Sequence, residues 1–257
     1  MEEELSYLRL HGCRASPPDK FVKEINSARL AALHVAEALD NRLEDHIHSV
    51  LNDNPALAGI RRLMPNSTPP ALARYQSDYP KYDPLEVDRE IRAHGVILGE
   101  GQFLFHGGCW PTERDVFVTD RPFSTSFCPQ IALGNASWSG KAYDVGHIDL
   151  MVVRVTGAET EAYLYGPDGD LGHEKEVVFA EGAELRILSR KLAGSKMVAT
   201  MGANTPYAEK KVPVYVIEAE ISQIVLTLLV RGARPCNDSN PIRFDWRSSI
   251  PEVTISP

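Results

Sequence analysis

The sequence predicts an α+β protein, with a helical region at the N-terminus and a mostly β domain after it. Apolar residues recur at spacings of three and four from Pro18 to Leu51, which is the period of a helix. From Val96 onward, short apolar runs are bounded by Gly, Pro and Asp, which is typical of strands. Between them, residues 52–84 are dense in turn formers. We therefore predict two parts: an N-terminal helical region with a Pro-rich linker (1–84) and a mostly β domain (85–257).

The composition excludes several broad classes of protein. The 257 residues are 43% hydrophobic and 24% charged, which is typical of a globular chain with a sizeable core. The net charge of -8 argues against a general binder of nucleic acid, because such binding relies on Lys and Arg that neutralise phosphates. No apolar run is long enough to span a bilayer, so we expect no membrane partner.

The cysteines and the N-terminus predict a reducing compartment. Cys13, Cys109, Cys128 and Cys236 show no Cys-x-x-Cys spacing, which favours free thiols over a disulfide framework. The first residues, Met-Glu-Glu-Glu-Leu, lack the basic and apolar regions of a conventional secretory signal. We expect a cytoplasmic protein, or one delivered into a target cell without such a signal.

The helical region is expected to form one long helix or two short ones. His46 and His48 are two residues apart, which places them on different sides of a helix, so we expect exposed polar side chains and no metal site. A further helix is predicted over Leu85–His94, ending at Gly95 as a C-cap. The strands expected after it are 103–105, 116–118, 148–155, 162–165, 176–179, 185–188, 212–221 and 224–230.

Two acids two residues apart precede one of these apolar runs. Side chains at i and i+2 of a strand share a face, so Glu174 and Glu176 are expected to project together while Lys175 points away. Like charges side by side resist burial, so such a pair is favoured where it is solvated or meets a cationic ligand. The alternative is an edge strand whose acids face water.

Two other stretches carry polar side chains at strand ends. In Gln102–Gly108, His106 is placed to hydrogen-bond a ribose or carboxamide, and the following glycines allow the backbone to approach a ligand. The alternative is an ordinary strand-end histidine. In Phe123–Phe127, alternation aims Ser124 and Ser126 to one face and Thr125 to the other.

Taken in order, Phe-His-Gly-Gly, Phe-Ser-Thr-Ser-Phe and Glu-Lys-Glu-Val-Val-Phe resemble the mono-ADP-ribosyltransferase superfamily, in particular its toxin- and effector-like members. The resemblance covers about Val96 to Val230. It implies a split β-sheet that holds NAD as a substrate. Glu176 would stabilise the ribose cation, Glu174 would orient or deprotonate the acceptor, and Ser124 would hold Glu176.

The resemblance also implies contacts with the dinucleotide. The residues it assigns to NAD are His106, Gly107, Phe105, Thr125, Ser126, Phe127 and Phe123. Of these, Phe123 and Phe127 would supply stacking surfaces. A loop over Pro129–Trp138 would cover the nicotinamide and phosphates, and the loop 165–172 would recognise the acceptor. His106 stands where toxin-like members usually have arginine and is typical of the diphtheria-toxin and poly-ADP-ribose polymerase branch. Arg114 or Arg121 is then the candidate to hold the diphosphate.

The predicted activity is therefore cleavage of the nicotinamide–ribose bond and transfer of ADP-ribose to a protein, with arginine as the favoured acceptor. A nucleic acid acceptor is disfavoured by the net charge. Two other hypotheses stay open: a silent NAD or ADP-ribose binding module, and a metal-dependent hydrolase that uses His106, His147, His173 and the two acids. The N-terminal helices would dock the acceptor, bind an inhibitory partner or brace the sheet.

Overall fold

The computed structural model describes residues 25–37, 41–110, 114–157, 161–167, 171–200 and 206–223. Its helices are α2 (Ala28–Glu37), α3 (Asn41–Asp53), α4 (Pro55–Leu63), α5 (Pro70–Ser77), α6 (Pro84–His94), α7 (Pro129–Ser137), α8 (Lys141–Val145) and the 3₁₀ turns η1 (Trp138–Gly140) and η2 (Gly172–Glu174). Its strands are β1 (Val96–Ile97), β2 (Phe103–Gly108), β3 (Val116–Val118), β4 (Phe123–Ser126), β5 (Ile148–Val155), β6 (Glu161–Leu164), β7 (Glu176–Phe179), β8 (Ala183–Ala199) and β9 (Glu209–Gln223).

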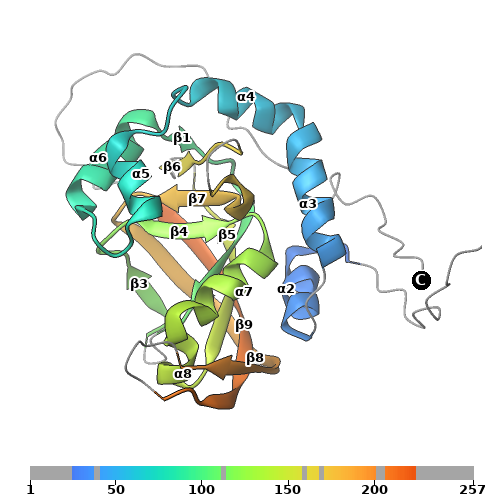
Figure 1. Cartoon of the computed structure of the whole chain (residues 1–257). Helices are drawn as coiled ribbons and strands as arrows, with labels where there is room; N and C mark the ends of the chain where they lie inside the picture. The colour runs from blue at the N-terminus through green and yellow to red at the C-terminus, as the bar shows by residue number, and fades with distance from the viewer. Residues whose placement is uncertain are drawn as a thin grey trace, which may run out of the picture.

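The strands form a mixed sheet in the order β1-β6-β7-β4-β2-β5-β9-β8-β3. Its neighbours pair antiparallel except β5 and β9, which are parallel. In Figure 1, α3 and α4 pass from α2 around the end of the sheet that carries β1 and β6, and reach α5 and α6 on the other side. The predicted α+β class is confirmed.

The periodic segment from Pro18 to Leu51 forms two helices in its described part, α2 and α3. The expectation that both of its close histidines are exposed was wrong for one of them. His48 is exposed and bonds Asn52 at 2.9 Å. His46 is half-buried, and its Nε2 has no hydrogen-bond partner among the described residues.

The expectation that residues 52–84 form a loop was wrong, because α4 and α5 lie within them. The prolines that suggested turns stand in the first turn of their helices: Pro55 in α4, Pro70 in α5 and Pro84 in α6. Proline suits this position, since its missing N–H has no partner in the first turn and its φ is already helical. The prolines therefore mark helix starts here.

The later elements match the sequence-based boundaries closely. The predicted helix before Gly95 is α6, with Gly95 at its C-cap. The strands β3, β5 and β7 have the predicted limits, and β8 and β9 extend beyond theirs as a long hairpin. Glu181–Gly182 forms the turn between β7 and β8, and Gly182 has a φ of 83°, which favours glycine. The predicted strand 224–230 lies outside the described residues.

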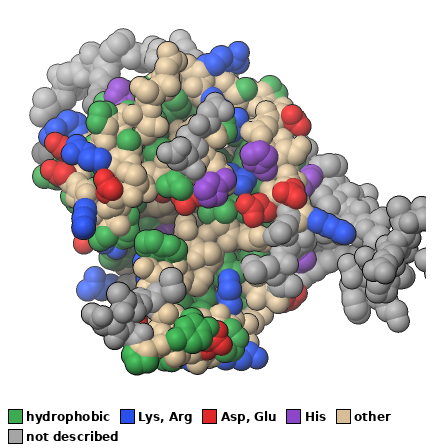
Figure 2. Space-filling view, in the orientation of Figure 1, with side chains coloured by type: hydrophobic (Ala, Val, Ile, Leu, Met, Phe, Trp, Pro, Cys, Tyr) green, Lys and Arg blue, Asp and Glu red, His purple; other side chains and the backbone are tan. Residues whose placement is uncertain are grey.

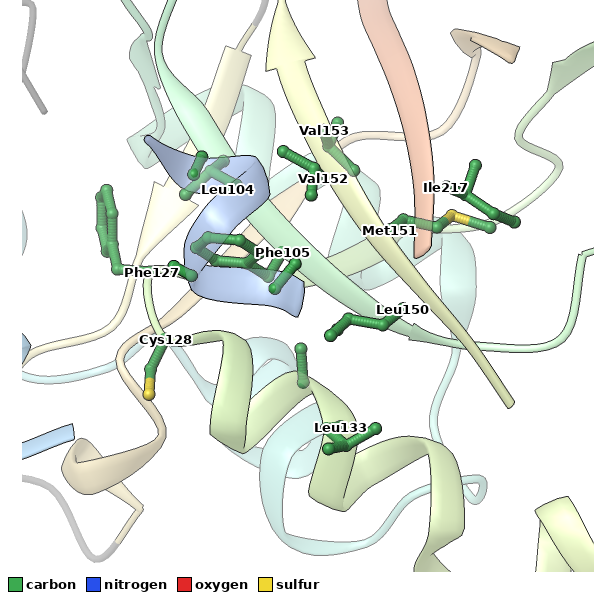
Figure 3. Packing of buried hydrophobic residues seen from close by; sticks show 14 of the residues in the cluster. Leu104, Phe105, Phe127, Cys128, Leu133, Leu150, Met151, Val152, Val153 and Ile217 are labelled. Atoms are coloured by element: carbon green, nitrogen blue, oxygen red, sulfur yellow. The ribbon is translucent and has the colours of Figure 1, made fainter. Parts of the chain in front are cut away.

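The segment Pro129–Trp138, expected to be a loop over the nucleotide, is mainly helix α7 packed against β2 and β5. Figure 3 shows Leu133 of this helix facing the apolar side chains of the two strands, among them Phe105 and Leu150. A Cβ on Gly107 would lie 1.6 Å from the carbonyl oxygen of Ala132. Gly107 therefore lets α7 pack closely against β2. The sequence had led us to expect that a ligand would approach the backbone here.

A second cluster of buried residues joins α5 and α6 to the sheet. Leu72 and Tyr75 of α5 pack with Ile91 of α6 and with Tyr163 and Val178 of the strands. The Tyr165 hydroxyl donates to the Leu72 carbonyl at 2.8 Å. This packing fixes α5 beside β6 and β7. Among the described residues, no helix has the length and apolar character to cross a membrane.

Candidate active site

A cleft of about 620 Å³ opens beside β2, β4 and β7. Figure 2 shows acidic and histidine side chains gathered on this face, between the end of β7 and α3. Nine of the ten site residues predicted from the sequence border the cleft: Phe105, His106, Gly107, Phe123, Ser124, Thr125, Ser126, Glu174 and Glu176. The sheet order accounts for this, since β2, β4 and β7 are neighbours.

Glu176 is the most buried acid of the cleft, with 8% of its surface exposed. The Ser124 hydroxyl donates to its Oε1 at 2.5 Å, and the Gln76 amide donates to its Oε2 at 3.2 Å. Burial raises the pKa of Glu176 to about 7; the bond from Ser124 opposes this, and the charge of Glu174 adds to it. This carboxyl is therefore held in one position and titrates near neutrality.

Glu174 does not share a strand face with Glu176, so that expectation was wrong. It ends the turn η2, and Lys175 follows with a φ of 52°, so β7 begins only at Glu176. Both acids nevertheless border the same cleft. Burial raises the pKa of the half-buried Glu174 as well. The two carboxyls come together because of the turn η2, and not because side chains alternate along a strand.

His106 lies across β4 from the acids. Its Nδ1 donates to the Ser124 carbonyl at 2.7 Å, because a carbonyl can only accept. Its ring lies 4.4 Å from that of Phe123. Burial is the main cause that lowers the pKa of His106 to about 4, so the ring is neutral at pH 7 and Nε2 is an acceptor.

The other two hydroxyls of the second motif brace the site. Thr125 donates to the Val177 carbonyl at 2.8 Å, on the strand that carries Glu176. Ser126 donates to the Glu174 carbonyl at 2.6 Å and accepts from the Cys128 amide at 3.0 Å. These bonds tie β4 to β7 and to the turn before it. One motif thus holds both acids, through Ser124 and Ser126.

The three predicted phenylalanines divide between the cleft and the core. Phe123 borders the cleft beside His106. Phe105 also borders it, but its side chain is fully buried against α7. Phe127 is 6% exposed, packs in the core and borders a separate small pocket behind η2. The expectation of a stacking surface from Phe127 is therefore wrong, since the chain's own apolar side chains cover it.

Sequence reasoning missed the residues that the N-terminal region contributes. Gln76 and Tyr75 come from α5, a hundred positions before Glu176, and border the cleft together with Tyr79 and Tyr82. The rings of Tyr75 and Tyr82 meet edge to face, with centroids 4.7 Å apart. The only sequence signal for this cluster is the spacing of tyrosines within the segment taken for a linker. Lys141, at the start of α8, borders the cleft too.

The histidines of the metal-hydrolase reading do not come together. His147 pairs with Asp149 at 3.2 Å, and Asp149 also accepts from Arg190 at 2.9 Å. His173 is exposed in η2. Over the described ranges, no three His, Cys, Asp or Glu side chains gather as metal ligands. Arg121 borders the cleft, whereas Arg114 is exposed and is not among the bordering residues.

Comparison with known proteins gives structural neighbours only. No protein-family model and no curated protein matches the chain. Among the solved structures similar to it are the ADP-ribosyltransferases Vis and Plx2a and an exoenzyme S. Vis of Vibrio splendidus, in complex with agmatine, has 12% identity and a TM-score of 0.36, over 89% of this chain and 96% of that one.

The other two are bacterial proteins of comparable similarity. The toxin Plx2a of Paenibacillus larvae has 9% identity and a TM-score of 0.32, over 72% and 88% of the two chains. Exoenzyme S of Pseudomonas aeruginosa, in complex with human 14-3-3 protein beta and bound to carba-NAD, has 14% identity and a TM-score of 0.32, over 81% and 95%.

Proposed function

We propose that this protein is an NAD-dependent mono-ADP-ribosyltransferase, which cleaves the nicotinamide–ribose bond of NAD and transfers ADP-ribose to a protein side chain, with arginine as the favoured acceptor. One observation carries the proposal. The buried Glu176 is fixed by Ser124 from β4 and by Gln76 from α5, in a cleft that also holds Glu174 and a neutral His106.

The geometry supports a site that stabilises a cationic sugar. When the bond between C1′ and the nicotinamide nitrogen breaks, its electron pair moves to the nitrogen and positive charge develops on the ribose. A carboxylate held in place by Ser124 and Gln76 interacts with that charge more strongly than with the neutral sugar, which lowers the barrier. The unprotonated Nε2 of His106 is suited to accept a hydrogen bond from a ribose hydroxyl.

Glu174 supports the transfer step. It stands at the end of η2, and its raised pKa suits a group that takes up a proton. As the guanidinium nitrogen of the acceptor attacks C1′, the carboxylate of Glu174 pairs with the guanidinium and takes the proton that the new bond displaces. The ionised form of Glu176 meets the ribose cation and takes up no proton from the acceptor, so the two acids have separate roles.

A matched pair of variants tests this division. We expect Glu176→Gln to lower both NAD hydrolysis and transfer by roughly 10²- to 10³-fold, because it keeps the shape of the side chain but removes the charge that meets the ribose cation. Glu174→Gln should lose transfer to arginine while NAD hydrolysis persists. Nicotinamide release and label from NAD on lysate proteins measure the two steps, and mass spectrometry locates the modified residue.

Near-normal turnover in Glu176→Gln would overturn the assignment. NAD binding without any nicotinamide release by the unaltered protein would identify a silent binding module. Label that resists protease and disappears with nuclease would replace the arginine acceptor by a nucleic acid.

A further inference from the structure

The first motif leaves the cleft without a permanent positive charge at His106. The ring is neutral at pH 7, since burial above all lowers its pKa to about 4. Its Nδ1 is occupied by the Ser124 carbonyl, so the remaining Nε2 presents a lone pair. A lone pair repels a phosphate oxygen. His106 therefore suits a hydroxyl group and not an anion.

Two cations border the same cleft, namely Arg121 and Lys141. Both cations lie close enough to His106 that their charges add to the effect of burial in lowering its pKa. Over the residues that the structure describes, no carboxylate forms an ion pair with either of them. The Lys141 ammonium instead lies over the rings of Tyr79, at 5.2 Å from the centroid, and Trp138, at 5.5 Å. Both charges are available to a ligand.

Glu176 and Arg121 belong to different ends of strand β4. The register pairs Ser126, at the end of β4, with Glu176. Arg121 comes two residues before β4 begins at Phe123, so its backbone lies beyond the opposite end. Burial above all raises the pKa of Tyr75 and of Tyr82, and the charge of Arg121 opposes this rise, which places that charge near the tyrosines of α5 and the turn after it. The cleft thus has two acids at Glu174 and Glu176, whereas Arg121, with Asp120 before it in the chain, borders the cleft toward the other end of β4.

We propose that Arg121 and Lys141 form an anion subsite that holds the diphosphate of the dinucleotide. This rests on the proposed function, and it assigns to two residues outside the three motifs a charge that the neutral His106 does not supply. The charge pattern fits such a ligand, which is anionic at its diphosphate and becomes cationic at the nicotinamide ribose. The fork of Arg121 suits two phosphate oxygens, and Lys141 adds a point charge from another element, α8.

Titration calorimetry of the full chain with ADP-ribose tests the subsite without any turnover. We expect Arg121→Gln and Lys141→Met each to raise the Kd for ADP-ribose by about ten- to hundredfold, the range for one charge-assisted hydrogen bond. The double variant should bind still more weakly and show a smaller salt dependence. Nicotinamide riboside, which has no phosphate, should bind all of these proteins with an unchanged Kd.

Arg114→Gln is the matched control, because it removes an exposed arginine that does not border the cleft. Its Kd for ADP-ribose should equal that of the unaltered protein. An unchanged Kd in the double variant, or an equal rise in Arg114→Gln, would overturn the subsite. An equal loss of nicotinamide riboside binding would also overturn it, by showing that the cleft itself has changed.

The same measurements separate the subsite from the proposed function. If the unaltered protein binds ADP-ribose through Arg121 and Lys141 but releases no nicotinamide from NAD, the transferase proposal fails and the subsite stands. If it cleaves NAD while the double variant keeps the Kd of the unaltered protein, the subsite alone fails. If the unaltered protein does not bind ADP-ribose or NAD, both fail.

Discussion

At the scale of single residues, the burial of Glu176 lowers the stability of the folded chain. Its pKa is about 7 in the folded protein, against an ordinary value of 4.5. Between these two pH values the folded state binds more protons at this site than the unfolded state does. The free energy of unfolding therefore falls as the pH rises from about 4.5 to about 7. The ionised carboxylate of Glu176 thus lowers the free energy of unfolding, at the position where the proposed reaction requires a negative charge.

Glu176→Gln should therefore stabilise the protein at pH 8 and have little effect at pH 4. The upper estimate of the gain is about 3 kcal/mol, from a pKa raised by roughly 2.5 units at 1.36 kcal/mol each. Thermal unfolding of the variant and of the unaltered protein at several pH values measures the difference.

Glu100→Gln provides the control, since Glu100 is exposed. It should change stability by less than about 0.5 kcal/mol at either pH. A gain in Glu176→Gln that is equal at pH 4 and pH 8 would contradict a burial-raised pKa.

At the scale of elements, an N-terminal helix holds the turn between the two acids. Lys175 is 6% exposed in its side chain; its ammonium donates to the His173 carbonyl at 2.8 Å and lies 3.5 Å from the Glu44 carboxylate of α3. The other oxygen of Glu44 accepts from Gln130 of α7 at 3.1 Å. Helix α3 thus links α7 to the backbone that presents Glu174.

Removing this link should reduce transfer more than NAD hydrolysis. We expect Glu44→Gln and Lys175→Met each to lower the rate of transfer to arginine by about tenfold, since a small displacement of Glu174 is costly. The double variant should lose little more than either single one, because both remove the same contact. The rates of transfer and of NAD hydrolysis are measured for the unaltered protein, the two single variants and the double variant, which together form a double-mutant cycle.

Asp45→Asn alters the next, exposed residue of α3 and should leave both rates unchanged. Losses that simply multiply in the double variant would show that Glu44 and Lys175 act independently.

At the scale of the whole molecule, the N-terminal helices and the sheet share their cores. Residues of α2, α3 and α4 belong to the same buried cluster as β2, β5 and β9. Leu72 and Tyr75 of α5 belong to the cluster that covers β6 and β7. The division at residue 84, predicted from the prolines, would cut through both clusters.

A fragment of residues 85–257 should therefore lose cooperative thermal unfolding. Without α5, the side chains of Tyr163 and Val178 would face water, and Glu176 would lose the bond from Gln76. Circular dichroism during heating measures this, with the full chain as the reference. A sharp transition in the fragment at the temperature of the full chain would instead support two independent domains.

The sequence by itself determined the elements whose signals are local. The strands β3, β5 and β7 have their predicted limits, and α6 ends before Gly95 as expected. Alternation, helical period and capping depend only on neighbours in the chain, which is why they can be read there. The motif residues on β2, β4 and β7 border one cleft because these strands pair directly.

The tertiary structure alone decided which distant residues complete the site. Gln76 reaches Glu176 across a hundred positions, and Lys141 enters the cleft from α8. Phe127, the last residue of the second motif, packs in the core instead. Such placements follow from the order of strands in the sheet and from which helix covers each face. No local period encodes them, since they depend on the free energy of burying the whole set of apolar faces together.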